Sequence, residues 1–322
     1  MKKILGMGAA LVDVLSFVDE AWVSSSGSAK GGMTLINEEQ SQKLLSQIQN
    51  SVLVPGGSAC NTIVGLAKLG AKTAFISKIG EDDLGHRFIA HLKEAGVESK
   101  LLYSKKATGS VLAAVTPDAQ RTMFTYLGAS DDLGVEDITP TLFDDVSLFY
   151  IEGYRAYNGP CFKKALQLAK KAGALTAVDF GAFSVVEHCR VLFDELFQEK
   201  LVDIIIANED EALAYTGKPE ADALAVLATK APVAVVKLGK RGALISKEGQ
   251  TVSVDALVVD ALDTTGAGDL WAAGFLYAYL KGESLAVCGE WASLVASEVV
   301  QVMGPQIPKE GWARIHNLLS ST

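Results

Sequence analysis

A short run of small and acidic residues, D-T-T-G-A-G-D at positions 263–269, carries the strongest chemical signal in the sequence. The apolar stretch 270–280 follows it and is typical of a buried helix. The run therefore lies at a helix N-terminus, where backbone N–H groups lack intrahelical partners and the dipole is positive. Gly266, Ala267 and Gly268 would let an oxyanion approach that backbone closely. The segment predicts a phosphate site.

Asp269 falls in the first turn of the same helix, where a carboxylate suits a catalyst better than a phosphate-binding site. It can take a proton from a hydroxyl group while the backbone amides stabilise the charge that develops on a phosphoryl group in transfer. A tight turn followed by a helix-capping acid also accounts for these letters.

A second group of polar residues lies near the N-terminus. Asp13 stands in an otherwise apolar run, where an unpaired carboxylate is costly to bury. A hydroxyl-rich ligand is one partner for it, and a backbone N–H group or a basic side chain is another. Gly56, Gly57 and Asn61 fit the same ligand, although Asn61 is near a helix start and is also suited to capping.

Two further patterns follow apolar runs in the second half of the chain. Asn208 and Glu211 are three residues apart and so share one helical face, where they fit a capping box. Lys237 precedes a turn that contains Gly239 and Gly242, and a solvated hairpin explains this turn without any ligand.

The elements that must position these residues alternate along the chain. Apolar runs at 147–151, 175–180, 203–207 and 233–238 predict strands that are covered on both faces. Amphipathic segments such as 61–69 and 161–172 predict the helices between them. Repeated strand–helix–strand units give an α/β fold with a doubly wound parallel sheet flanked by helices.

Two stretches interrupt the alternation and predict a small β-sheet lid. Residues 14–36 read as a strand, a Ser/Gly-rich loop at 24–32 and another strand, and residues 108–127 read as a hairpin with strands at 110–116 and 122–127 and a turn at 117–120. The predicted organisation is a core of residues 1–13, 37–107 and 128–322, with a lid of residues 14–36 and 108–127.

Composition excludes several classes of function. The 322 residues carry 29 basic and 38 acidic side chains, a net charge of −9, which argues against a nucleic-acid partner. The apolar run 271–280 is too short to span a membrane. The four cysteines form no C-x-x-C pair, which favours a reducing, cytoplasmic location. The pair Gly6 and Gly8 begins a dinucleotide-binding pattern, but its third glycine is absent.

The run 263–269 resembles the C-terminal signature of the PfkB (ribokinase-like) family of carbohydrate and nucleoside kinases, and G-G-S-A-C-N at 56–61 resembles that family's N-terminal segment. The resemblance covers nearly the whole chain and implies a ribokinase-like fold. It makes Asp269 the catalytic base and Gly266, Ala267 and Gly268 the anion hole, with Thr264 and Thr265 beside the nucleotide.

The resemblance also implies roles for the other motifs. The set expected to clamp substrate is Asp13, Gly56, Gly57 and Asn61, and the set expected to contact ATP is Asn208, Lys237, Gly239 and Gly242. Glu211 would organise Mg²⁺, largely through water. Residues 292–303 and the following Gly304 resemble the family's adenine-pocket helix and the loop that often completes a monovalent-cation site, which would hold K⁺.

The implied reaction is ATP-dependent phosphorylation of a primary hydroxymethyl group. Residues 31–36 and 115–130 are most similar to the bacterial adenosine-kinase-like branch, which favours adenosine as the small-molecule acceptor over a sugar of the ribose or fructose type. Apolar lid residues could stack on a purine or form the core of the lid, and they are Met33, Leu35, Met123, Phe124 and Tyr126. A non-catalytic nucleotide or nucleoside sensor is the alternative from another class. The edges of a lid sheet can pair between subunits, which is compatible with a homodimer.

Overall fold

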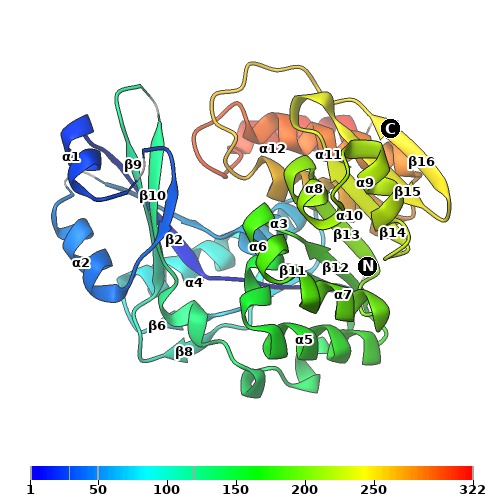
Figure 1. Ribbon diagram of the computed structural model, residues 1–322, viewed down its shortest axis with the longest axis horizontal. Helices are drawn as coiled ribbons and strands as arrows, with labels where there is room; N and C mark the ends of the chain where they lie inside the picture. Colours follow the sequence, from blue (N-terminus) through cyan, green and yellow to red (C-terminus); the bar gives the residue numbers. More distant parts are fainter. Residues whose placement is uncertain (1, 29, 49–50, 119, 321–322) are drawn as a thin grey trace.

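Two β-sheets and the helices around them organise the chain, as the computed structural model of residues 2–28, 30–48, 51–118 and 120–320 shows (Figure 1). The large sheet has nine strands. In spatial order they are β16 (Gln250–Val254), β15 (Ala243–Lys247), β14 (Val233–Lys237), β13 (Ile204–Asn208), β12 (Leu175–Asp179), β11 (Val146–Glu152), β1 (Lys3–Met7), β5 (Thr73–Ile76) and β7 (Glu98–Ser99). From β14 to β7 all neighbours are parallel, whereas β15 and β16 add an antiparallel edge.

Helices cover both faces of this sheet, which confirms the predicted doubly wound core. One face carries α5 (Gly159–Lys171), α6 (Phe183–His188), α7 (Arg190–Gln198), α8 (Glu209–Thr216) and α9 (Glu220–Leu227). The other carries α3 (Ser58–Lys68), α4 (Asp83–Ala95), α10 (Ala267–Lys281) and α11 (Leu285–Val299), with α12 (Lys309–Leu319) packed outside α10 and α11.

The central strands are apolar throughout because both of their faces are buried. Along β11, Phe149 and Ile151 point into the α5–α9 layer, while Leu148 and Tyr150 point into the layer that holds α3 and α10. The four strands and two helices predicted from the sequence are confirmed, with bounds that differ by up to three residues. Within the described part of the chain, no helix is long and apolar enough to cross a bilayer.

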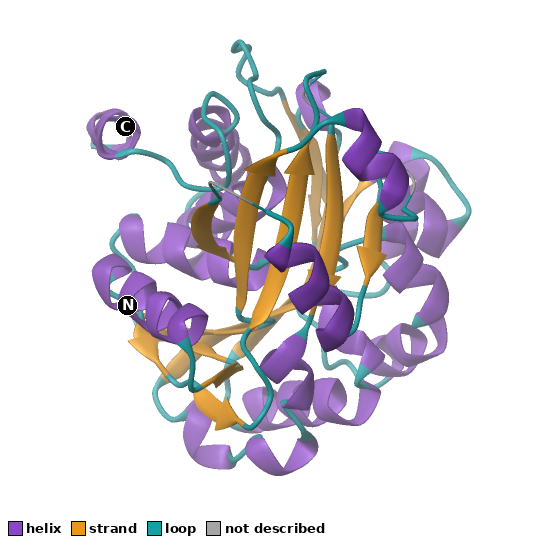
Figure 2. Cartoon of the chain, turned by 90° about the vertical axis from the view of Figure 1, so that its left-hand side faces the viewer, coloured by secondary structure: helices purple, strands orange, loops and turns teal. Residues whose placement is uncertain are grey.

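The second sheet stands beside the core, on the left in Figure 1 and facing the viewer in Figure 2. Its spatial order is β3 (Met33–Leu35), β10 (Arg121–Tyr126), β9 (Gly109–Val115), β2 (Leu11–Phe17) and β4 (Val52–Gly56). The helix α2 (Glu38–Ser46) packs against β9 and β10. A separate two-stranded sheet pairs β6 (Lys78–Gly80) with β8 (Leu102–Ser104). The small sheet thus takes in β4, which lies outside the ranges expected for the lid.

Two local expectations at this sheet were wrong. A loop was expected from residue 24, but the helix α1 (Glu20–Ser25) includes the first two residues of that stretch. Asp19 caps this helix by accepting a hydrogen bond from the Trp22 amide at 2.7 Å. The first strand, β1, ends at Met7, so Asp13 lies on β2 of the small sheet rather than on a strand of the core. Ala119 of the predicted turn lies outside the described residues.

Candidate active site

The first turns of α3 and α10 meet, and Asp269 lies at their contact. Its Oδ1 accepts a hydrogen bond from Ser58 Oγ at 2.7 Å, and its Oδ2 accepts one from Asn61 Nδ2 at 2.9 Å. The α3 partners come from more than 200 residues earlier in the chain. Asn61 is therefore not a helix cap: it lies inside α3, and Gly57 occupies the cap position without any side-chain hydrogen bond. Ser58 was missed by the sequence analysis.

The N-terminus of α10 is open to an anion. Gly266, its cap residue, has φ of +76° and provides no side-chain hydrogen bond. A Cβ atom there would lie 2.7 Å from Pro305 Cβ, so the position requires glycine for both its backbone conformation and its packing. The Ala267 amide donates to Thr264 O at 3.1 Å. The amide of Gly268 belongs to the first turn, where N–H groups lack intrahelical acceptors, so its position suits a contact with an external anion.

A buried ion pair brings a cation to this helix end. Lys237, the last residue of β14, donates from Nζ to Asp179 Oδ2 at 2.9 Å. The same Nζ lies 3.2 Å from the position that a Cβ atom on Gly268 would occupy. The sequence analysis named Lys237 as an ATP contact, and the structure places its charge against the proposed anion hole. Asp179, at the end of β12, was missed because nothing in the letters around it signals a site.

The protonation of Asp269 is set by opposing influences. Burial raises the pKa of its carboxyl group above the ordinary value, and the negative charge of Asp179 acts in the same direction. The hydrogen bonds from Asn61 and Ser58 and the charge of Lys237 lower that pKa. The three partners therefore favour the carboxylate, which is the form that a general base needs.

The N-terminus of α8 is closed by its own side chains. Asn208 Oδ1 accepts from the Glu211 amide at 2.9 Å, and Glu211 Oε2 accepts from the Asn208 amide at 2.8 Å, which confirms the capping box. Glu211 is buried, and this burial, with the nearby charge of Asp179, raises its pKa to about 7, whereas Lys237 lowers it. Asp179 thus raises the pKa of both Glu211 and Asp269, and Lys237 lowers the pKa of both.

This surplus of negative charge fits a magnesium ion that arrives with a nucleotide. Among the described residues, no three His, Cys, Asp or Glu side chains are close enough to hold a metal ion without other ligands. Magnesium usually keeps several water molecules and takes one or two carboxylates together with substrate phosphates. Glu211 and Asp179 fit that mode of binding better than a preformed protein cage.

The residues expected to clamp substrate gather where β2 and β4 end beside α3. Asp13 Oδ2 lies 3.2 Å from the position of a Cβ atom on Gly56, so the carboxylate lies against the Gly56 backbone. Gly57 has φ of +99°, and a Cβ atom there would lie 2.4 Å from Ala9 O. Glycine is thus required at 57 by its backbone conformation and its close contact with Ala9 O, whereas at 56 it makes room for the Asp13 carboxylate. Asn61 lies one helical turn beyond Gly57.

A buried carboxylate that the sequence analysis missed supports this corner. Glu152 ends β11 and accepts hydrogen bonds from the amides of Ala9 at 2.8 Å and Ala59 at 2.7 Å. It therefore joins the β1–β2 connection to the first turn of α3. Burial raises the pKa of Glu152 to about 7 against the lowering effect of these hydrogen bonds. In the sequence, the signal for Glu152 was an acidic residue at the end of an apolar run.

Four further residues were expected to contact the nucleotide: Gly239, Gly242, Thr264 and Thr265. Gly239 and Gly242 flank a single 3₁₀ turn between β14 and β15, and a Cβ atom on Gly242 would lie 1.9 Å from Val254 O. Gly242 therefore has a packing role whether or not it touches a nucleotide. Thr265 donates from its amide and its hydroxyl to Asp263 Oδ1, at 2.9 and 2.8 Å, while Thr264 is exposed.

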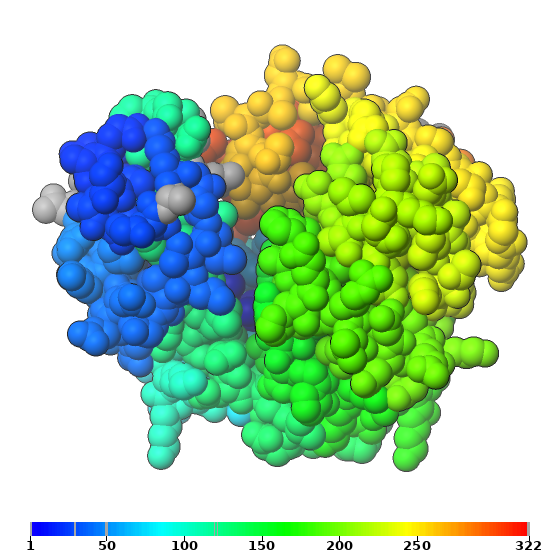
Figure 3. Space-filling model, in the orientation of Figure 1, coloured from blue at the N-terminus to red at the C-terminus, as the bar shows by residue number. Residues whose placement is uncertain are grey.

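An open cleft of about 700 Å³ separates the small sheet from the α10 loop. It is lined by Lys30, Gly31, Gln120 and Met123 from the small-sheet side and by Thr265 from the core. The space-filling view shows the furrow between these two parts of the molecule (Figure 3). The cleft leads from the small sheet to the loop that precedes Asp269.

Known proteins share this architecture over their full length. The structure of adenosine kinase from Sinorhizobium meliloti matches with a TM-score of 0.89 and 34% sequence identity, covering 99% of each chain. A probable sugar kinase from Rhizobium etli matches with a TM-score of 0.90 and 31% identity, covering 100% of this chain and 99% of that one. A nucleoside kinase from Methanothermobacter thermautotrophicus is 28% identical over 263 residues, or 80% of this chain and 82% of the relative.

The profile of the pfkB family carbohydrate kinases matches residues 23–311, which include the residues around Asp269 and all the helices that meet there. Kinases of this family use ATP as phosphate donor, typically with Mg²⁺. The fold, the nucleoside and sugar kinase relatives and the family match agree. The chain belongs to the pfkB family of carbohydrate kinases and is a phosphotransferase that acts on a nucleoside or a sugar.

Proposed function

We propose that the protein is an ATP- and Mg²⁺-dependent kinase that phosphorylates the primary hydroxymethyl group of a nucleoside, with adenosine as the favoured acceptor. The observation that carries the proposal is the placement of Asp269. Its carboxylate is held by Ser58 and Asn61 beside an uncapped helix N-terminus, with the ammonium group of Lys237 against the same helix end.

In this proposal Asp269 takes the proton of the acceptor hydroxyl as the hydroxyl oxygen attacks the terminal phosphorus of ATP. The first-turn amide of Gly268 and the Lys237 ammonium group stabilise the negative charge on the phosphoryl oxygens. Bound Mg²⁺ would neutralise further charge on the phosphates, with Glu211 holding it through water. Asp13, the Gly56–Gly57 backbone and Asn61 orient the acceptor.

The choice of a nucleoside rests on the cleft and on the relatives. Phe124 and Tyr126 are buried in the small sheet, so they form its core and are not free to stack on a purine. Met123 is 36% exposed and lines the cleft, where it offers an apolar surface to a base. Adenosine kinase is also the name of a structural relative that matches along 99% of the chain.

A sugar acceptor is the second candidate, since the relative from Rhizobium etli is named a probable sugar kinase and covers the chain equally well. A sugar would use the same hydroxyl clamp and leave the apolar part of the cleft to water. We infer for either acceptor that the small sheet closes over the cleft as a lid and excludes water, which limits hydrolysis of ATP.

Three further expectations stay predictions. A K⁺ site would use the loop at Gly304, whose amide donates to Asp263 Oδ2 at 2.8 Å and so ties the loop to the turn before α10. A homodimer through the small sheet is compatible with the exposed Met33 and Leu35 at its edge. A cytoplasmic location rests on the four cysteines, all free and buried.

The test is a screen of ADP release with adenosine, other nucleosides, ribose, fructose and their phosphates as acceptors. We expect the highest kcat/KM with adenosine, and a product phosphorylated at the primary hydroxyl by ³¹P NMR. A higher kcat/KM for a free sugar would replace the nucleoside with a sugar. Binding of ATP and adenosine without ADP release from any acceptor would instead indicate a non-catalytic sensor.

A further inference from the structure

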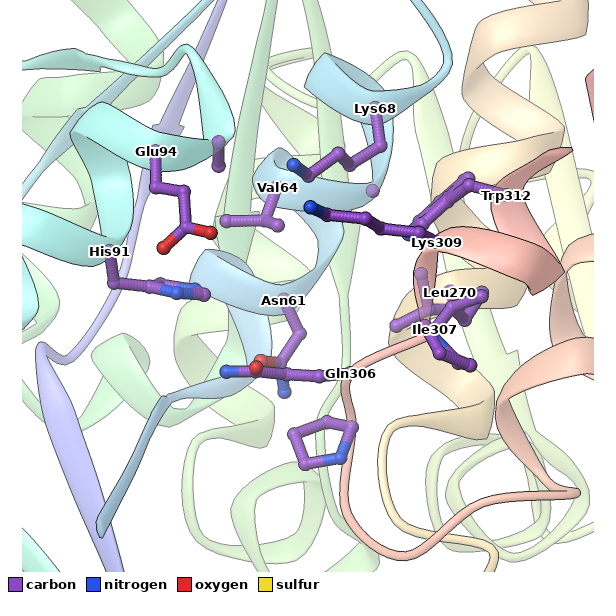
Figure 4. A pocket seen from close by; sticks show the side chains of 14 residues that line it. Asn61, Val64, Lys68, His91, Glu94, Leu270, Gln306, Ile307, Lys309 and Trp312 are labelled. Atoms are coloured by element: carbon purple, nitrogen blue, oxygen red, sulfur yellow. The ribbon is translucent and has the colours of Figure 1, made fainter.

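A second cavity lies outside the cleft, along the flank of α3. It has a volume of about 210 Å³ and is enclosed by α3, α4 and the segment that leads into α12 (Figure 4). On α3 it extends from Asn61 in the first turns to Lys68 at the end of the helix. Neither Asp269 nor any residue of the small sheet lines it, so it is distinct from the substrate cleft.

The charged side chains of this cavity are two lysines and one glutamate, and burial lowers the pKa of the His91 imidazole, so the lining has a surplus of one positive charge. Lys68 and Lys309 extend into it, and in the described part of the chain neither ammonium group forms an ion pair. His91 adds a ring nitrogen on the α4 side, and Glu94 is the single acid among the described lining residues. Lys309 also begins α12, whose N-terminus has no side-chain cap. In a chain with a net charge of −9, this surplus of positive groups is local and favours an anionic ligand.

The opposite wall is apolar and includes a flat ring. Trp312 lies across from α3, and Leu270 and Ile307 complete this side. A bare inorganic anion would leave these surfaces in contact with water, whereas a ligand with a flat apolar body would cover them. We propose that this cavity binds a small organic anion that has a planar apolar body and a carboxylate group, and that binding of this anion alters the affinity of the active site for the acceptor. The effect on the acceptor rests on the proposed kinase function.

Two contacts connect the cavity to the active site. Asn61 lines the cavity and donates through Nδ2 to Asp269 Oδ2 at 2.9 Å. Pro305, on the other wall, packs on Gly266, where a Cβ atom would lie 2.7 Å from Pro305 Cβ. A ligand that moves either wall changes the position of the base or of the anion hole. By thermodynamic linkage, acceptor binding must then change affinity for the ligand by the same factor.

Gln306, the residue after Pro305, extends this connection to the residues proposed to clamp the substrate. Gln306 lines the cavity and donates from Nε2 to Pro55 O at 3.2 Å, directly before the Gly56–Gly57 pair. One short segment therefore touches the cavity, the anion hole and the strand that ends in the clamp. This continuity of direct contacts is the physical basis for coupling between the two sites.

The binding test uses 4-fluorobenzoate as the probe and the full-length protein, with ¹⁹F NMR line broadening as the readout. We expect saturable binding that weakens about tenfold in each of Lys68→Met and Lys309→Met and further in the double variant, since each removes one charge-assisted contact. Lys93→Met is the matched control, because Lys93 is an exposed α4 lysine outside the lining, and it should bind as the wild type does. Neutral 4-fluorobenzamide should bind at least tenfold more weakly.

Three results would overturn the site: no binding of 4-fluorobenzoate at millimolar concentration, affinity that is unchanged in the double lysine variant, or equal competition by inorganic phosphate at matched ionic strength. Coupling is measured as a change in the acceptor KM on addition of the probe, in the wild type but not in the double variant. An unchanged KM would overturn the coupling. The NMR signal does not depend on turnover. If the protein binds the probe but is inactive with every acceptor, the kinase proposal is refuted and the anion site is still supported.

Discussion

The N-termini of α10 and α8 lie at the same end of the large sheet and differ in how they satisfy their backbone amides. At α10 the cap residue is Gly266, no side chain caps the helix, and a lysine ammonium group lies against the first turn. At α8 Asn208 and Glu211 cap each other in a complete box. Both had been expected to serve the nucleotide. We infer that the α10 end is the one that receives an external anion, whereas the α8 end is filled by its own side chains.

A helix that begins with polar or small residues can leave its first-turn amides available to a ligand, or it can use them to bind its own side chains. First-turn amides of α10 without an intrahelical acceptor, such as that of Gly268, can stabilise charge on a transferring group, whereas the Ala267 amide already donates to Thr264 O. At α8 the capping box satisfies the amides of Asn208 and Glu211, so what this end offers is the carboxyl group of Glu211, whose pKa is raised to about 7 by burial and by Asp179. We therefore expect changes at α10 to act on turnover and changes at α8 to act on magnesium use and stability.

The largest effect is expected for Asp269→Asn, which leaves the open end of α10 intact and removes its base. We expect kcat to fall by about 10²–10⁴, since general-base catalysis contributes that much. The acceptor Kd should change little, because Asn61 can still donate to the amide oxygen of the variant, while the Ser58 hydroxyl can accept from its amide NH2 group. ADP release and calorimetric titration measure the two quantities. A folded variant with full turnover would refute the assignment of Asp269.

The next effect concerns the cation at the open end. Lys237→Met should lower kcat by about 10²-fold, because it removes one electrostatic contact to the phosphoryl group. The acid limb of the pH–rate profile should also move to higher pH, since Lys237 lowers the pKa of Asp269. The single variant leaves Asp179 unpaired, so its fold must be checked by thermal unfolding.

The control for that variant is the double substitution Lys237→Met with Asp179→Asn, which removes both partners of the ion pair. If the double variant regains stability but not turnover at saturating Mg²⁺, and Asp179→Asn alone retains turnover there, the effect on catalysis belongs to the lysine. Recovery of wild-type turnover in the folded double variant would show that Lys237 acts only as a counter-ion of Asp179.

At the closed end, two substitutions separate charge from capping. Glu211→Gln keeps a residue that can complete the capping box, so stability should change by less than about 1 kcal/mol while the Mg²⁺ concentration for half-maximal rate rises about tenfold. Asn208→Ala should cost about 1 kcal/mol of stability through the lost cap. Denaturant unfolding and magnesium titration of the rate measure both. Equal magnesium dependence in Glu211→Gln and the wild type would argue against a role of Glu211 with the metal.

The last expected effect leaves turnover aside and is a pH dependence of stability. The pKa values of Glu211 and Glu152 are raised to about 7 in the folded protein from about 4.5 when exposed. Between these values the folded state binds more protons than the unfolded state, so the free energy of unfolding should fall as pH rises from about 4.5 to 7. At about 1.4 kcal/mol per pKa unit, each group contributes up to about 3 kcal/mol. Glu211→Gln should reduce this slope, and a slope unchanged by that substitution would contradict the shifted pKa of Glu211.

The fold was largely predictable because its signals are local. The apolar runs that became β11 to β14 mark strands buried on both faces, and the glycine-rich run before α10 marks a helix start. The antiparallel strands β15 and β16 and the helix α1 were missed. Asp19 and Glu20 carried a capping signal for α1, but the serines that follow favoured a loop.

The sequence by itself determined the central strands β11 to β14, the helix α10 and the acid that follows the glycine-rich turn at its start. Only the tertiary structure decided that Ser58 and Asn61 hold Asp269, that Lys237 lies beside Gly268, and that Glu152 joins β1 to α3. The physical reason is distance along the chain. Periodicity and capping depend on residues within a few positions, whereas a buried polar site is built from side chains that packing of the whole sheet and its helices brings together.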